Sequence, residues 1–115
     1  LLGVRSIFTE RENGKMTLRR GFRIEPGEKV LIVEDIVTTG GSIREVVDVV
    51  NQAHGDIVGI GLFVDRSGGK ADYGVEPEKV FPLVHLTVPT YTAEECPLCK
   101  AGVPVTERGS HHLKK

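Results

Sequence analysis

The sequence predicts an α/β fold with a mainly parallel sheet, and three segments carry this prediction. Residues 30–33 and 57–64 are apolar runs with no polar alternation, which is typical of strands buried on both faces of a parallel sheet. Between them, from Ser42 to about His54, apolar residues recur at helical spacing before Gly55. Strand, loop, helix and strand in this order indicate an open α/β sheet.

Length and composition are those of one ordinary globular domain, residues 1–115, with a polar C-terminal tail from about residue 104. Fifteen basic and sixteen acidic residues give a net charge of −1, which indicates neither a nucleic-acid surface nor a membrane surface. No apolar stretch approaches the roughly 20 residues that span a bilayer, and no signal peptide is apparent. We therefore expect a cytoplasmic protein that binds no nucleic acid and no membrane.

The first elements are two short strands, at residues 4–9 and 16–20, joined by the charged segment 10–15. Asn13-Gly14 within that segment is a strong signal for a β-hairpin turn. From the residues alone, the segment is a solvated turn.

The central segment ends in two carboxylates and a small-residue loop. Glu34 and Asp35 follow the apolar strand, and Ser42 begins the helix. The N-terminus of a helix at the carboxyl end of a strand offers unpaired N–H groups to an anion. Gly40 and Gly41 allow close approach of the backbone to a phosphate. Hydroxyl donors are supplied by Thr38, Thr39 and Ser42.

The two acids would repel a phosphate unless the same ligand also carried hydroxyl groups or a divalent cation. A sugar phosphate meets both conditions. The sequence contains neither Gly-x-x-x-x-Gly-Lys-Ser/Thr nor Gly-x-Gly-x-x-Gly after a strand, so the common nucleotide-binding motifs do not apply.

Three further features follow the central segment. Asp65-Arg66 ends the second buried strand and is either an ordinary surface ion pair or part of a ligand site. Residues 79–88 predict a last strand, at an edge or beginning at Pro82, in which His85 is a packed or edge residue. His54 is expected to cap its helix.

Cys96 and Cys99 are too few for a disulfide scaffold, and we interpret them as structural or incidental. A zinc site would need four ligands, and only His111-His112 in a folded-back tail could complete one. A redox role lacks the expected preceding βαβ pattern.

The segment Val-Glu-Asp-Ile-Val-Thr-Thr-Gly-Gly-Ser, residues 33–42, resembles the phosphoribosyl pyrophosphate (PRPP) motif of type I phosphoribosyltransferases. Almost all of the chain resembles the orotate phosphoribosyltransferases, including Asp65-Arg66 and the sequence Glu-Glu-Cys-Pro-Leu-Cys at 94–99. The resemblance implies a type I phosphoribosyltransferase (Rossmann-like) core whose N-terminal part is apparently missing. It also implies transfer of phosphoribose from PRPP to orotate, giving orotidine 5′-monophosphate and pyrophosphate in pyrimidine synthesis.

The resemblance further assigns roles to individual residues. Glu34 and Asp35 are expected to be catalytic and to hold the ribose hydroxyls, while Thr38 and Arg66 bind orotate. The residues expected to bind PRPP are Glu34, Asp35, Ile36, Val37, Thr38, Thr39, Gly40, Gly41 and Ser42. Mg²⁺ is expected as a cofactor carried by PRPP, with no direct protein ligand.

In this family a mobile basic loop between the first two strands closes over PRPP, partly onto the other subunit of a homodimer. Lys15 or Arg11 would fill that catalytic role. This loop is shorter than usual for the family, so the alternative that both residues belong to a plain turn stays open. Two alternatives remain, a phosphoribosyltransferase for a purine or another base, and a non-catalytic PRPP-binding regulator. A sugar-phosphate-binding domain without transferase activity is also consistent with the sequence.

Overall fold

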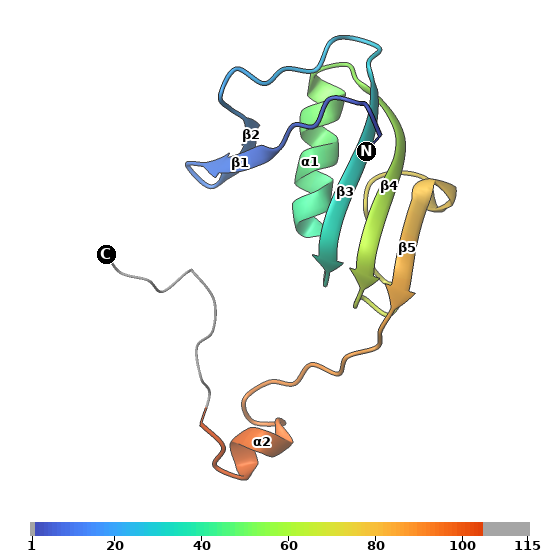
Figure 1. Cartoon of the computed structure of the whole chain (residues 1–115). Helices are drawn as coiled ribbons and strands as arrows, with labels where there is room; N and C mark the ends of the chain where they lie inside the picture. Colours follow the sequence, from blue (N-terminus) through green and yellow to red (C-terminus); the bar gives the residue numbers. More distant parts are fainter. Residues whose placement is uncertain (1, 105–115) are drawn as a thin grey trace.

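A computed structural model of the chain describes residues 2–104 and contains a three-stranded sheet, a hairpin and two helices (Figure 1). The elements in chain order are β1 (Thr9–Glu12), β2 (Lys15–Leu18), β3 (Lys29–Val37), α1 (Gly41–Gln52), β4 (Asp56–Asp65), the 3₁₀ helix η1 (Pro77–Lys79), β5 (Val80–His85) and α2 (Pro97–Lys100). The larger sheet has the order β3-β4-β5, and both of its strand pairs are parallel. The predicted α/β fold with a parallel sheet is confirmed.

Strands β1 and β2 form the predicted antiparallel hairpin, in which Glu12 pairs with Lys15. Its turn residues have positive φ angles, 50° at Asn13 and 79° at Gly14, as a two-residue type I′ turn requires. The prediction of a strand at residues 4–9 is wrong for residues 4–8, because β1 begins only at Thr9. In the preceding segment Arg5 donates instead to Glu28, at 2.6 Å between Nη2 and Oε1.

The hydrophobic core lies between α1 and one face of the sheet. Its most deeply buried side chains are Ile43, Val47 and Val50 of α1 and Ile60 of β4, whose exposure is 0%. Helix α1 covers this face along its length (Figure 1). The apolar stripe of the helix therefore accounts for the helical spacing in the sequence.

The opposite face of the sheet is exposed in the part of the chain that the structure describes. Val33 is 72% exposed and Phe63 is 66% exposed, and the same face carries Leu31, Phe81 and Leu83. The prediction that residues 30–33 and 57–64 are buried on both faces is therefore wrong in the part of the chain that the structure describes. Burial alternates along β3 because α1 packs against only one of its faces.

Helix α1 begins slightly earlier than predicted and also ends slightly earlier. It begins at Gly41 rather than Ser42, with Gly40 as its N-cap, and it ends at Gln52. His54 then adopts the left-handed conformation, with φ of 58°, and donates its N–H to the carbonyl of Asn51 at 2.9 Å. The backbone of His54 thus helps to end the helix, and the Gly55 N–H completes the Schellman motif by bonding to the carbonyl of Val50 at 2.9 Å.

Strand β5 is the edge strand that Pro82 predicted. It is shorter than the predicted 79–88, since Lys79 belongs to η1 and the strand ends at His85. Beyond it the chain turns toward the end of β4, where Thr87 forms an isolated antiparallel bridge with Ser67. His85 is an exposed edge residue rather than a packed one.

We predict that Gly55→Ala destabilises the chain by about 1–3 kcal/mol, because the core has no room for the added methyl group. A Cβ at this position would lie 2.8 Å from Cγ1 of Val50 and 3.0 Å from Cγ2 of Ile24. Gly61→Ala is the matched control. The side-chain atom nearest to its added Cβ would be Cγ1 of Val33, at 3.7 Å, which is an ordinary van der Waals distance. Urea unfolding of the three proteins measures the difference, and equal loss of stability in both variants would contradict this packing.

Candidate active site

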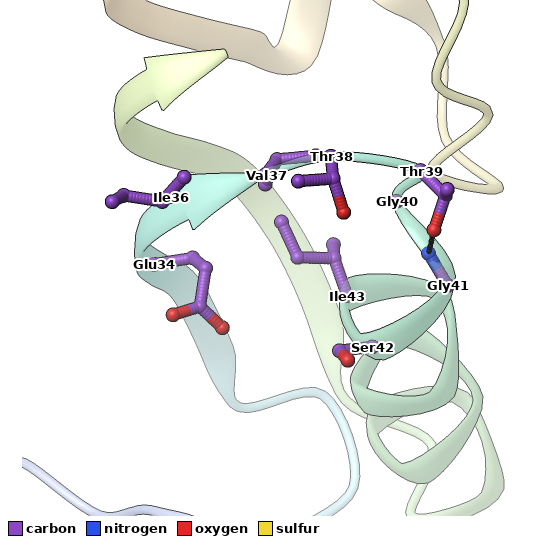
Figure 2. A pocket seen from close by; sticks show the side chains of 9 residues that line it. All are labelled: Glu34, Ile36, Val37, Thr38, Thr39, Gly40, Gly41, Ser42 and Ile43. Carbon is purple, nitrogen blue, oxygen red and sulfur yellow. Dashed lines mark hydrogen bonds between the residues drawn. The ribbon is translucent and has the colours of Figure 1, made fainter. Parts of the chain in front are cut away.

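A cavity of about 220 Å³ lies at the carboxyl end of β3, where the chain enters α1. The nine residues that line it are Glu34, Ile36, Val37, Thr38, Thr39, Gly40, Gly41, Ser42 and Ile43. Figure 2 shows the Glu34 carboxylate and the Ser42 hydroxyl on the same side of the loop, with Ile43 between them. All the residues expected to bind PRPP line this cavity except Asp35.

The N-terminus of α1 opens into this cavity without a side-chain cap. The N–H of Arg44 donates to the carbonyl of Gly40 at 2.9 Å, which is the first hydrogen bond of the helix. The N–H groups before Arg44 therefore have no partner within the helix. Near the start of the helix, Thr39 Oγ1 lies 3.5 Å from the N–H of Gly41, which is a long contact (Figure 2). The first N–H groups of the helix are therefore available to an anion, and the helix dipole favours one.

Gly40 is required by two features of the fold. Its φ angle of 84° is left-handed, and an added Cβ would lie 3.1 Å from the carbonyl oxygen of Asp72 and 3.2 Å from Cβ of Ala71. Arg44, in the first turn of α1, forms an ion pair with Asp72 that holds this loop against the helix. The loop after β4 therefore packs directly against the start of α1.

The two adjacent carboxylates at the end of β3 differ in their environments. Burial is the largest cause that raises the pKa of Glu34, and the charge of Asp35 acts in the same direction. The pKa of Asp35 is lowered, chiefly because its carboxylate accepts a hydrogen bond from the backbone N–H of Ile36 at 2.6 Å. Only Glu34 of the two lines the cavity. Asp35 is therefore the more readily ionised carboxyl group of the two, and Glu34 is the more readily protonated one.

A second cavity, of about 470 Å³, adjoins the first one. Its lining residues are Thr38, Thr39, Arg66, Ser67, Gly68, Lys70, Thr87, Val88, Pro89 and Thr90. Thr38 and Thr39 line both cavities, so one ligand can extend from the helix N-terminus to Arg66. The structure thus brings the two residues predicted to bind orotate, Thr38 and Arg66, to one cavity.

Arg66 is fixed at the end of β4 by its backbone N–H, which donates to the carbonyl of Val37 at 2.8 Å. Its side-chain Nε is buried and has no hydrogen-bond partner among residues 2–104. A buried donor without a partner is unfavourable, and a ligand acceptor would remove that cost. Arg66 therefore has one side-chain donor, Nε, that no described residue satisfies.

Asp65 forms its contacts with residues other than Arg66. Its carboxylate accepts a hydrogen bond from the N–H of Ser67 at 2.7 Å and lies 3.7 Å from Nδ1 of His85. Burial alone would raise the pKa of Asp65, but the hydrogen bonds from the hydroxyl and N–H of Ser67 lower it below its usual value. The interpretation of Asp65-Arg66 as an ordinary ion pair is therefore wrong.

The two candidate cations of the hairpin lie outside both cavities. Arg11 forms an ion pair with Glu45 of α1, at 2.7 Å, and also donates to the carbonyl of Gly14 at 3.0 Å. Its hydrogen bond with Glu45 raises the pKa of Arg11. Lys15 begins β2 and is exposed. The catalytic role of either residue stays a prediction.

One wall of the second cavity is formed by residues to which no sequence motif assigned a site role. Lys70 and Ser67 lie in the loop after β4, and residues 87–90 follow the end of β5. The sequence places residues 87–88 in the last strand, so it does not indicate that they line a cavity. The usable signal was that parallel strands end at the same edge of a sheet, so the segment after β5 meets the loop after β4.

Comparison with known proteins identifies the family. Residues 4–82 match the family described as "Phosphoribosyl transferase domain". The chain belongs to this family. The fold is accordingly that of the type I phosphoribosyltransferases, and the structure of adenine phosphoribosyltransferase from Rhodothermus marinus superposes with a TM-score of 0.53 at 25% identity, covering 74% of this chain and 52% of that one.

Curated relatives of this phosphoribosyltransferase chain are named orotate phosphoribosyltransferase. The protein from Desulforamulus reducens is 55% identical over 112 residues, which are 97% of this chain and 57% of that protein. The protein from Thermotoga maritima is 52% identical over 113 residues, which are 98% of this chain and 59% of that protein. The chain thus spans somewhat more than half the length of these relatives.

Two further findings concern only residues 2–104. No group of three or more His, Cys, Asp or Glu side chains in this range is placed to hold a metal ion. No helix in the same range has the length and apolar character to cross a bilayer. The polar tail beyond residue 104 lies outside the described residues. It includes His111-His112, the two residues that could complete a zinc site with Cys96 and Cys99.

We predict opposite pH effects on stability from neutralising the two acids. Because the pKa of Glu34 is raised in the folded state, its stabilising contribution is present at low pH and is lost as the pH rises through that pKa. Glu34→Gln should therefore raise Tm at about pH 7. The pKa of Asp35 is lowered, so its contribution is present at neutral pH, and Asp35→Asn should lower Tm there.

Thermal unfolding followed by circular dichroism between about pH 3 and pH 7 measures these effects. Glu34→Gln should approach the parent as the pH falls through the raised pKa of Glu34, whereas Asp35→Asn should do so only at lower pH, because the lowered pKa keeps Asp35 charged. Shifts of the same sign in the two variants at neutral pH would contradict the assigned environments.

Proposed function

We propose that this chain provides the PRPP site and the base site of an orotate phosphoribosyltransferase, which forms orotidine 5′-monophosphate and pyrophosphate for pyrimidine synthesis. The observation that carries this proposal is the junction of the two cavities at Thr38 and Thr39, with a helix N-terminus in one cavity and Arg66 in the other. The names of the relatives support the choice of orotate.

In the first cavity the 5-phosphate of the ligand binds the N-terminus of α1. Backbone N–H groups of the first turn and the hydroxyls of Thr38, Thr39 and Ser42 donate to the phosphate oxygens. Glu34, at the other side of the same cavity, accepts hydrogen bonds from the ribose hydroxyls, and Asp35 acts beside it. The acids also stabilise positive charge that develops on the ribose as pyrophosphate leaves.

In the second cavity Arg66 binds the carboxylate of orotate. A guanidinium group matches a carboxylate with two parallel hydrogen bonds, and the unpaired Nε of Arg66 supplies a donor that needs an acceptor. Thr38, which lines both cavities, contacts the base beside the ribose. Lys70 adds a second positive charge to the wall of this cavity.

Mg²⁺ accompanies PRPP in this proposal and is carried by the oxygens of that ligand, with no direct protein ligand. Bound Mg²⁺ neutralises charge on the pyrophosphate group. Glu34 and Asp35 attract the ion–ligand complex, while Lys15 or Arg11 assists pyrophosphate after movement of the hairpin. The proposal includes the homodimer and the cytoplasmic location implied by the resemblance to the family.

A second candidate is a phosphoribosyltransferase for a purine base. The superposition with adenine phosphoribosyltransferase supports this candidate, because that protein has a similar fold and is named for a purine base. A purine has no carboxylate, so the unpaired Arg66 donor speaks for orotate. A third candidate, a regulator that binds PRPP without transfer, would use only the first cavity.

The function is tested by calorimetry and a pyrophosphate-release assay on the chain. With PRPP and Mg²⁺ present, we expect orotate to bind and release pyrophosphate, whereas adenine and hypoxanthine do neither. Binding and release with adenine or hypoxanthine instead would favour the purine enzyme. Binding of PRPP without release on any base would favour the regulator.

We predict that Arg66→Ala weakens orotate binding in the presence of PRPP by at least about tenfold, because the carboxylate loses its charged partner. PRPP binding should change little, since Arg66 lies outside the first cavity. Arg23→Ala is the matched control, because the Arg23 side chain is 82% exposed and pairs only with Glu25. Equal loss of PRPP and orotate binding in Arg66→Ala would contradict the assignment of Arg66 to the base.

A further inference from the structure

The sugar-phosphate site makes no use of the two cysteines near the end of the described chain. Cys96 and Cys99 are both free, and Cys99 is exposed while Cys96 is half-buried. Neither lines a cavity, and the extended segment after β5 separates α2 from the sheet (Figure 1). The pair therefore calls for an account of its own.

Backbone hydrogen bonds hold both cysteines in fixed positions. The N–H of Cys96 donates to the carbonyl of Thr92 at 2.9 Å, and the carbonyl of Cys96 accepts from the N–H of Lys100 at 3.0 Å. The carbonyl of Cys99 accepts from the N–H of Gly102, also at 3.0 Å. Residues 92–102 thus form a small ordered unit with the two cysteines one helical turn apart, which brings their side chains together.

The two thiols lie one helical turn apart and are not equivalent. The Cys96 sulfur accepts hydrogen bonds from the backbone N–H of Cys99, from the Cys99 thiol and from the N–H of Leu98, and these lower the pKa of Cys96. The same contact between the thiols raises the pKa of Cys99. Cys96 is thus the better thiolate, and Cys99 holds a proton beside it.

A zinc site is the main alternative use of such a pair, and it normally takes four ligands. Across the described range 2–104, no third His, Cys, Asp or Glu side chain joins the two cysteines in a possible metal site. Two free thiols one helical turn apart need no further ligand to form a disulfide. The geometry therefore favours thiol chemistry over metal binding, and over the structural or incidental role that the sequence predicted.

We propose that Cys96 and Cys99 form a reversible thiol–disulfide site that reacts with low-molecular-weight disulfides such as glutathione disulfide. The Cys96 thiolate attacks one sulfur of the oxidant, which forms a mixed disulfide and releases one glutathione thiolate. Cys99 then loses its proton and attacks the Cys96 sulfur, which releases the second glutathione. Two protein thiols are oxidised to one disulfide, one glutathione disulfide is reduced to two thiols, and the two protons pass to the released thiolates.

The position of the pair makes the disulfide readily reducible. Cys99 is exposed, so a small thiol can reach the bond, and only two residues separate the cysteines. Exposed disulfides have higher reduction potentials than buried structural ones and are the labile class. The site is independent of the proposed transferase activity, because it lies outside both cavities.

The test is oxidation of the whole chain by excess glutathione disulfide, followed by intact-mass analysis and labelling with a maleimide. We expect the parent chain to lose two hydrogen atoms, to retain no glutathione and to resist labelling until dithiothreitol is added. Cys99→Ser should stop at a mixed disulfide on Cys96. Cys96→Ser should react with iodoacetamide at neutral pH at least about tenfold more slowly than Cys99→Ser, because the remaining thiol has the higher pKa.

Three results would overturn this inference. They are stable glutathione on both cysteines of the parent chain, disulfides formed only between chains, or a purified protein whose thiols stay unreactive until a chelator removes zinc. The last result would establish metal binding instead. Both variants change a thiol to a hydroxyl outside the core, so loss of folding would not confuse the comparison.

Discussion

The left-handed turn at Gly40 is the constraint on which the site depends. It ends the loop after β3 and directs the first turn of α1 toward the cavity, with no side chain capping the helix. The loop after β4 packs against the same residue, which leaves no room for a side chain there. One backbone conformation therefore sets both the helix N-terminus that an anion needs and the position of the loop that begins with Arg66.

Packing supports this arrangement from one side only. The apolar stripe of α1 is anchored on Ile60 and its neighbours, so the cavity rests on the best-packed part of the chain. The other face of the sheet presents Leu31, Val33 and Phe81 to solvent among residues 2–104. Parallel sheets are usually covered on both faces, and this chain spans somewhat more than half the length of its curated relatives. Stability and the site therefore both depend on the face that α1 covers.

Local chemistry made much of the fold and site predictable. The hairpin followed from Asn13-Gly14, the edge strand from Pro82, and the turn from strand to helix that lines the first cavity from two adjacent glycines. Features that depend on distant neighbours were not predictable. His85, which lies beside the Asp65 carboxylate, comes from β5, and the contact of Arg11 with Glu45 spans 34 positions. Residues 4–8 looked like a strand, but strand formation also needs a pairing partner.

The most direct test of the central claim is a titration of the chain with ribose 5-phosphate, followed by backbone amide NMR. If the uncapped start of α1 binds the phosphate, the largest shifts occur at the amides of residues 38–43, with smaller ones at Glu34 and Asp35. Gly40→Ala should abolish them, since the added Cβ disturbs the turn. Shifts centred on another part of the chain, or saturable binding that survives unchanged in Gly40→Ala, would contradict the account.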